Sequence, residues 1–387
     1  MGASAHWIAF INSYIYGQFL FSLVSLHDAP NMIRSAIVAT GSYIPSLTIK
    51  NEHFSNAQFF EKDGSRLNKT NDSIIAKFQE ITGIAERRYA LPDQKASDLA
   101  FLAATDAIES SGIDRETLDY LIVAHNFGDI AHESTRIDIV PSLASRVKAL
   151  LKIKNPDCVA YDLPFGCPGW VEGMIQANYF IRSGDAKRCL IIGTETLSRV
   201  IDPHDRDSMI YSDGSGAVIL QADTRHDKGI ISHKTQTFAA DHAMLLNMDC
   251  SYAPDAKSKM DLFIKMNGRK VYEFALNHVP LVVKNVLDKA GVSLDAVSKV
   301  LIHQANHKMD SAILERIFRL YGVAQVSEDV MPMTIGWLGN SSVATVPTLL
   351  DLILKSKLPG HSIAEGDHVV MASVGAGMNI NALLYRF

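Results

Sequence analysis

The sequence predicts an α/β fold built from two copies of one unit, because the same order of helix and strand patterns occurs twice. In each copy a helical pattern ends at a glycine, Gly112 in the first and Gly291 in the second. An apolar run typical of a buried strand begins nine residues later, at 121–123 and again at 300–302. Alternating helices and strands of this kind favour a sheet covered by helices.

A second pair of strand patterns supports the repeat and sets its boundaries. Residues 189–192 form an apolar run that reaches Gly193, and residues 369–372 form its counterpart near the C-terminus. We therefore expect one unit over residues 32–226 and another over residues 227–387. Chance agreement between ordinary helix and strand patterns is the alternative explanation.

The first 31 residues differ from the rest of the chain in composition. No Lys, Arg, Asp or Glu occurs before Asp28, and the stretch from Trp7 to Leu26 is mostly apolar and aromatic. Polar residues interrupt that stretch, and the missing basic flanks argue against a signal peptide and a membrane span. Three interpretations of residues 1–31 stay open: an extension upstream of the true start, a membrane-associating segment, or a helix packed on the core.

Composition excludes several classes of function. The 387 residues carry 37 Lys plus Arg against 42 Asp plus Glu, a net charge of −5 that does not suit binding to a nucleic-acid backbone. The four cysteines are too few for a disulfide framework in so long a chain, and their spacing does not indicate zinc. We therefore expect a cytoplasmic protein that binds neither nucleic acid nor metal.

Cys167 is the candidate nucleophile. It lies in a tight Gly-Cys-Pro-Gly segment directly before a helical pattern that ends at Gly184. Unpaired backbone N–H groups and the positive end of the helix dipole favour a thiolate at such a position. Pro168 suits the first helical turn, where its missing N–H costs nothing. A buried structural cysteine is the alternative interpretation.

A cysteine nucleophile normally works with a histidine, and α/β folds place functional side chains at strand ends. His303 follows directly on the predicted strand at 300–302, and His125 has the same place in the first half. Taken alone, each histidine is better explained as a loop residue bonded to the backbone. Asn340 lies in a Gly-Asn-Ser-Ser turn ahead of another helical pattern, where the default role is that of a helix cap or turn residue.

Several separated motifs resemble the 3-oxoacyl-(acyl carrier protein) synthase III family in order and spacing, and the resemblance extends from Met32 to Phe387. It implies a thiolase-like α/β fold, which is a duplicated αβαβα five-layered sandwich, and a homodimer. The motifs are GCPG around Cys167, DGSGA from Asp213, the run from His303 to Asn306, GNSS around Asn340 and VGAG near the C-terminus.

The resemblance also implies which residues act. Cys167, His303 and Asn340 would form a catalytic triad, and the backbone N–H groups of Cys167 and Ala376 would stabilise an oxyanion. The implied reaction transfers an acyl primer from acyl-CoA or acyl carrier protein to the cysteine. Decarboxylative condensation with malonyl-acyl carrier protein then gives a 3-oxoacyl product. Such a reaction requires no metal and no redox cofactor.

The expected substrate-binding residues match the family less well. Family members carry a Trp and an Arg upstream of the Thr-Gly-Ile motif, where this chain has Lys77 and Ile81. Arg206 matches an arginine that binds the nucleotide, and Lys308 replaces an arginine for carrier-protein docking, without its bidentate fork. Gly268, in a further matched motif, is also expected to bind substrate. The pattern suits a specialised paralogue at least as well as the initiating enzyme of fatty acid synthesis.

Two other classes of function stay open. A cysteine acyltransferase that passes the acyl group to a small nucleophile without condensation would use the same three side chains. Release of carbon dioxide during the reaction would distinguish a condensing enzyme from this acyltransferase. The alternative from another class is a non-catalytic partner subunit of a heterodimeric synthase, although such subunits characteristically lose the cysteine.

Overall fold

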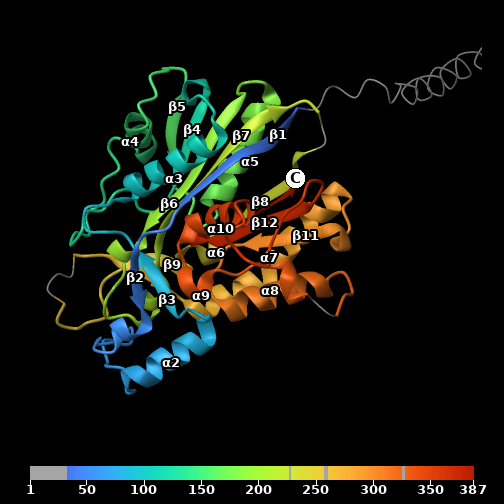
Figure 1. The fold of residues 1–387 in the computed structure, drawn as a ribbon. Coiled ribbons are helices and arrows are strands. Elements are labelled where there is room, and N and C mark those ends of the chain that lie inside the picture. The colour runs from blue at the N-terminus through green and yellow to red at the C-terminus, as the bar shows by residue number, and fades with distance from the viewer. Residues whose placement is uncertain (1–32, 226–227, 257–259, 325–326) are drawn as a thin grey trace, which may run out of the picture.

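The computed structural model describes residues 33–225, 228–256, 260–324 and 327–387. Two sheets are separated by a pair of helices and covered on their outer faces by further helices (Figure 1). This arrangement confirms the five-layered αβαβα sandwich expected from the sequence. The predicted boundary between the halves, at residues 226 and 227, and the first 31 residues lie outside the described part of the chain.

The first sheet has five strands in the order β1-β7-β6-β4-β5. β4 pairs in parallel with β5 and β6, whereas β7 runs antiparallel to β6 and β1. Consecutive residues of β4, from Leu121 to Val123, are fully buried, because helices cover both faces of this sheet. The strands are β1 (Arg34–Tyr43), β4 (Tyr120–Ala124), β5 (Val159–Leu163), β6 (Arg188–Thr196) and β7 (Asp213–Asp223).

The second sheet repeats four of these strands. Its order β8-β13-β12-β11 and its strand directions match β1-β7-β6-β4, so the predicted strands at 121–123 and 300–302 hold equivalent places. No strand equivalent to β5 forms in this sheet among the described residues. The strands are β8 (Gly229–Thr237), β11 (Val297–Ile302), β12 (His368–Gly375) and β13 (Asn379–Arg386).

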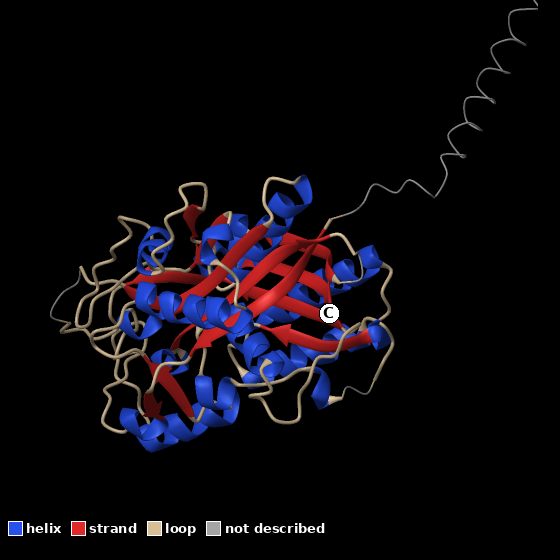
Figure 2. Cartoon of the chain, turned by 45° about the horizontal axis from the view of Figure 1, so that its top comes forward, coloured by secondary structure: helices blue, strands red, loops and turns tan. Residues whose placement is uncertain are grey.

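Helices form the other three layers (Figure 2). α3 and α4 cover the outer face of the first sheet, α7 and α8 cover that of the second, and α5 and α10 pack between the sheets. None of the helices described is both long and apolar enough to cross a membrane. The layer helices are α3 (Ala96–Ser111), α4 (Leu143–Leu150), α5 (Gly169–Ser183), α7 (Gly268–Ala290), α8 (His307–Arg319) and α10 (Thr345–Leu354).

Shorter elements gather at one end of the layers, where α2 projects from the rest of the fold (Figure 1). They leave a cavity between them rather than extending either sheet. These elements are β2 (Leu47–Lys50), α2 (Asn71–Thr82), β3 (Glu86–Tyr89), α6 (Ala239–His242), β9 (Leu246–Asp249), β10 (Phe263–Met266) and α9 (Ile335–Leu338).

Candidate active site

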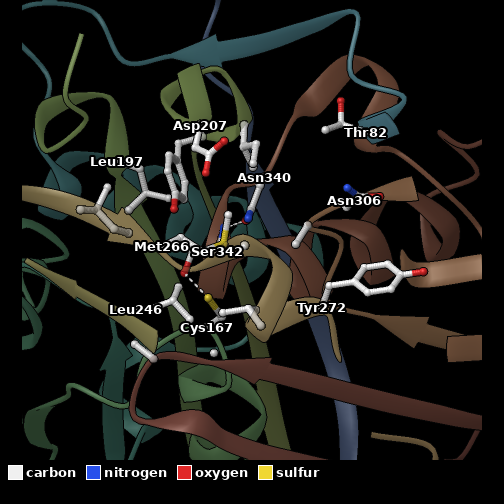
Figure 3. Close-up of a pocket in the computed structure, with 18 of the residues that line it drawn as sticks. Thr82, Cys167, Leu197, Asp207, Leu246, Met266, Tyr272, Asn306, Asn340 and Ser342 are labelled. Carbon is white, nitrogen blue, oxygen red and sulfur yellow. Dashed lines mark hydrogen bonds between the residues drawn. The ribbon is translucent and has the colours of Figure 1, made fainter. Parts of the chain in front are cut away.

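A cavity of about 870 Å³ brings together the three side chains expected to act in catalysis. Cys167 lies between β5 and α5 in the first half of the chain. His303 directly follows β11, and Asn340 follows α9, so both come from the second half. The cavity wall includes all three residues, and Figure 3 shows Cys167 and Asn340 facing it.

Two glycines allow the loops around Cys167 to approach closely. A Cβ atom on Gly375 would stand 2.8 Å from the Cβ of Cys167, and one on Gly166 would stand 3.1 Å from the backbone N of Ala376. Gly166 also has a φ of +69°, which few other residues tolerate. The backbone N–H groups of Cys167 and Ala376 both act to lower the pKa of the Cys167 thiol. The two expected oxyanion donors therefore lie near the nucleophile.

Ser342 hydrogen-bonds to two of the three expected catalytic residues. Its Oγ donates to Cys167 Sγ at 3.1 Å (Figure 3), and its backbone N–H donates to Asn340 Oδ1 at 2.8 Å. The backbone of Ser342 also raises the pKa of His303, against the larger effect of burial. No sequence pattern indicated a role for Ser342, although it belongs to the Gly-Asn-Ser-Ser motif.

Backbone hydrogen bonds to a neighbouring segment hold Asn340 in place. Its N–H donates to the carbonyl of Ile210 at 3.0 Å, and its carbonyl accepts from the N–H of Ser212 at 2.8 Å. Because its Oδ1 accepts from Ser342, its Nδ2 is the group left to donate into the cavity. Asn340 is therefore a turn residue but not a helix cap, since α10 begins after Ala344 and has no side-chain cap.

The resting thiol and imidazole are both neutral. Burial raises the pKa of the Cys167 thiol to about 11, although Ser342 and the two backbone N–H groups act in the opposite direction. Burial also lowers the pKa of His303 to about 4. The expectation of a thiolate stabilised by the start of α5 is thus not met in the resting site, because desolvation outweighs the local dipoles. A neutral imidazole, however, can accept the thiol proton.

His125 has a different environment from His303. Its Nε2 lies 3.0 Å from Asp162 Oδ2, and its Nδ1 accepts from the N–H of Gly128 at 3.0 Å. Its side chain is buried and does not belong to the cavity wall. Of the two histidines at strand ends, only His303 reaches the cavity, and His125 connects neighbouring loops.

Comparisons with known proteins identify the family. The profiles of the N-terminal and C-terminal parts of 3-oxoacyl-[acyl-carrier-protein (ACP)] synthase III match residues 161–238 and 287–387. β-Ketoacyl-[acyl-carrier-protein] synthase III 1 from Vibrio vulnificus is 32% identical over 356 residues, which cover 91% of this chain and 99% of the relative. The chain belongs to the synthase III family. The resemblance stated from the sequence motifs is thereby confirmed.

Solved synthase III structures share the fold. The enzyme from Thermus thermophilus has a TM-score of 0.74 and 29% identity, covering 91% of this chain and 99% of that one. The priming β-ketosynthase of the R1128 polyketide biosynthetic pathway has a TM-score of 0.74 and 24% identity, covering 92% and 97% of the two chains. This second likeness concerns the fold alone, and both support the thiolase-like architecture.

The residues expected to bind substrate do not all lie at the synthase III cavity. Arg206 and Gly268 belong to its wall, and Arg206 is half-exposed at 3.9 Å from Asp207. Lys308 lies outside the wall, where it pairs with Glu80 at 3.3 Å. An exposed lysine of this kind is placed to meet a partner's surface rather than to hold a ligand in the cavity.

The wall of the cavity is mainly apolar. Lys77 and Ile81, which replace the aromatic and arginine positions of other synthase III chains, lie on its α2 side. Asp207 and Asn306 also line the cavity (Figure 3), although no sequence pattern indicated a role for either. The apolar wall residues on the paired strands β9 and β10 are Leu246, Met248, Ile264 and Met266, and Leu197 packs with the last three.

Proposed function

We propose that this chain condenses an acyl thioester primer with malonyl-acyl carrier protein, using Cys167, His303 and Asn340. The products are 3-oxoacyl-acyl carrier protein, carbon dioxide and the free thiol of the primer carrier. One observation carries the assignment of the residues: the three side chains come from both halves of the chain and meet at one cavity, where Ser342 bonds to both Cys167 and Asn340.

The first half-reaction loads the primer. Cys167 Sγ attacks the thioester carbonyl carbon while its proton passes to the neutral imidazole of His303. The N–H groups of Cys167 and Ala376 hold the oxyanion of the tetrahedral intermediate. The carrier sulfur then leaves with the electrons of its C–S bond and takes the proton from His303. The acyl group is left on Cys167, and the imidazole is neutral again.

The second half-reaction forms the new carbon–carbon bond. Asn340 Nδ2 and the one N–H of neutral His303 donate to the thioester oxygen of the malonyl unit. Carbon dioxide leaves, and the electrons of the broken C–C bond form an enolate that these donors stabilise. The enolate carbon attacks the carbonyl carbon of the acyl-cysteine, and the sulfur leaves with the electrons of its C–S bond and takes a proton from water. Removing one donor of this kind typically costs about 100 to 1,000-fold in rate.

The cavity supports a primer with an apolar acyl chain. Leu197, Leu246 and Met266 line it, and a hydrocarbon tail packed against them would be removed from water. The phosphopantetheine arm would enter past Arg206. A homodimer and a cytoplasmic location are further parts of the proposal, and the exposed loop side chains of Ile139 and Val140 offer apolar surface for a second copy.

Mass spectrometry of the intact protein tests this function directly. Incubation with acetyl, octanoyl and dodecanoyl thioesters should add one acyl group, located at Cys167, and the adduct should be absent from Cys167→Ala. Cys250→Ala, at the other cysteine that is not fully buried, serves as the matched control and should still be acylated. An acyl group that passes to another nucleophile without release of carbon dioxide would instead support a non-condensing acyltransferase.

A further inference from the structure

A line of hydrogen-bonded polar side chains leads from Cys167 into the first half of the fold. Ser342 Oγ donates to Cys167 Sγ and also accepts from Asn126 Nδ2 at 3.0 Å. An amide nitrogen can only donate, so the serine oxygen is the acceptor of that bond. The hydroxyl hydrogen of Ser342 is therefore left to point at the sulfur.

The backbone of Ser342 has an unusual conformation that directs its side chain. Its φ is +53°, in the left-handed region that side chains other than Gly, Asn and Asp rarely adopt. The hydrogen bond from its N–H to Asn340 helps to hold this conformation. A serine kept at such a position costs stability, which indicates that its side chain serves a purpose there.

Glu195 fixes the amide of Asn126. It lies on β6, is 2% exposed, and its Oε1 accepts from the backbone N–H of Asn126 at 2.9 Å. The same oxygen also accepts from Asn126 Nδ2. Only the nitrogen end of the amide can meet two acceptor oxygens, so Glu195 decides which way Asn126 faces and hence where Ser342 points.

A glutamate in this environment is held in its neutral form. Burial raises the pKa of Glu195 to about 8, and the charge of Asp213 on β7 adds to the effect. The other titratable groups that face this relay are Cys167, ahead of α5, and His303, on the other side of Ser342. An ionised Glu195 would in turn raise the pKa of the Cys167 thiol.

We propose that Glu195 is a positioning residue for the nucleophile: through Asn126 it aligns the Ser342 hydroxyl as a donor to Cys167 Sγ, and ionisation of Glu195 weakens the nucleophile. The proposal deepens the proposed function and rests on it, because it assigns Cys167 the attacking role. It adds Glu195, Asn126 and Ser342 to the three side chains already assigned to the site.

Alkylation of Cys167 by iodoacetamide between pH 6 and pH 10 tests the relay without any acyl substrate. Ser342→Gly removes the hydroxyl and suits the left-handed backbone, so this variant should fold. Its alkylation at pH 8 should be about tenfold slower than in the wild type, because the thiolate loses a hydrogen-bond donor. Ser341→Ala is the matched control, since Ser341 is also buried but its hydroxyl bonds only to Thr345 among the described residues, and the alkylation rate of this variant should not change.

Two variants of Glu195 separate hydrogen bonding from charge. Glu195→Gln keeps an acceptor oxygen and cannot ionise, so it should match the wild type at pH 6.5 and react several-fold faster at pH 9.5. Glu195→Ala loses the acceptor and should be slow at every pH, like Ser342→Gly. Wild-type profiles for both Ser342→Gly and Glu195→Gln would overturn the relay.

The outcomes also distinguish this proposal from the proposed function. If the alkylation profiles shift as expected but no thioester acylates Cys167, the positioning role of Glu195 is supported and the proposed function is wrong. If Cys167 is acylated and the profile of Ser342→Gly equals that of the wild type, the function stands and the relay is wrong.

Discussion

Gly375 and Cys167 are in such close contact that a Cβ atom on the glycine would lie 2.8 Å from the Cβ of the cysteine. This contact joins the end of β12 in the second half to the start of α5 in the first. It brings the N–H of Ala376 to the sulfur of Cys167. The geometry of the site therefore depends on a glycine that takes no part in the chemistry.

Replacing Gly375 with alanine should impair catalysis more than it impairs folding. The added methyl group must push the 375–377 turn away from Cys167 and with it one oxyanion donor. We expect acylation to fall at least about 100-fold, and the free energy of unfolding to fall by about 1–3 kcal/mol. Single-turnover acylation and urea unfolding measure the two effects.

Gly336→Ala is the control for that substitution. A Cβ atom on Gly336 would meet its nearest neighbour, the carbonyl of Gly83, at the ordinary contact distance of 3.4 Å. Acylation by this variant should stay close to that of the wild type. Normal acylation by Gly375→Ala would show that the Ala376 N–H is not an oxyanion donor.

Asn340→Ala should uncouple the two half-reactions. The variant loses an enolate donor, so condensation and release of carbon dioxide should fall by about 100-fold or more while most of the self-acylation remains. His303→Ala should slow both steps, because the imidazole accepts the thiol proton and also donates to the enolate. Loss of acylation with intact carbon dioxide release in Asn340→Ala would contradict the role given to Asn340.

His303 should make the protein less stable in acid. Its pKa is about 4 in the folded site, below the ordinary value of 6.5, so the unfolded chain binds the proton more tightly. The stability present above pH 6.5 is therefore lost as pH falls towards 4, by about 3 kcal/mol in total. Urea unfolding of the wild type and of His303→Asn should diverge over this range, and parallel curves would refute the assignment.

Leu246→Trp should shorten the primers that the enzyme accepts. Leu246 lines the cavity (Figure 3), so a larger side chain there reduces the space for a hydrocarbon tail. We expect acylation by a dodecanoyl thioester to fall at least about tenfold, because overpacking of an apolar site is costly, with little change for an acetyl thioester. Met244→Trp, at a side chain that is 73% exposed, is the control. An equal loss for both primers would indicate that the tail lies elsewhere.

The sequence was most informative where a pattern is local. Helix-ending glycines and apolar runs predicted the strands β4 and β11. Short motifs indicated Cys167, His303 and Asn340 as candidate catalytic residues. The relay from Glu195 to Ser342 was not predictable, because Asn126 and Ser342 are 216 residues apart and meet only in the folded chain.

The protonation state of Cys167 also depends on the whole fold and could not be predicted from the local sequence. The start of α5 suggested a thiolate at Cys167, but the loops that bury the sulfur come from distant parts of the sequence and raise its pKa. Lys308 illustrates the same limit. The resemblance suggested that Lys308 binds the carrier protein, whereas its ion pair with Glu80 and its place outside the cavity wall are visible only in the folded chain.

The most direct test of the account follows a single acyl group through one turnover. The protein is first loaded with a labelled primer, and malonyl-acyl carrier protein is then added while intact mass and carbon dioxide are recorded. The account predicts that the adduct on Cys167 disappears, that one carbon dioxide is released per adduct, and that the label appears in a 3-oxoacyl-acyl carrier protein. An adduct that persists, or that is lost without carbon dioxide, would contradict it.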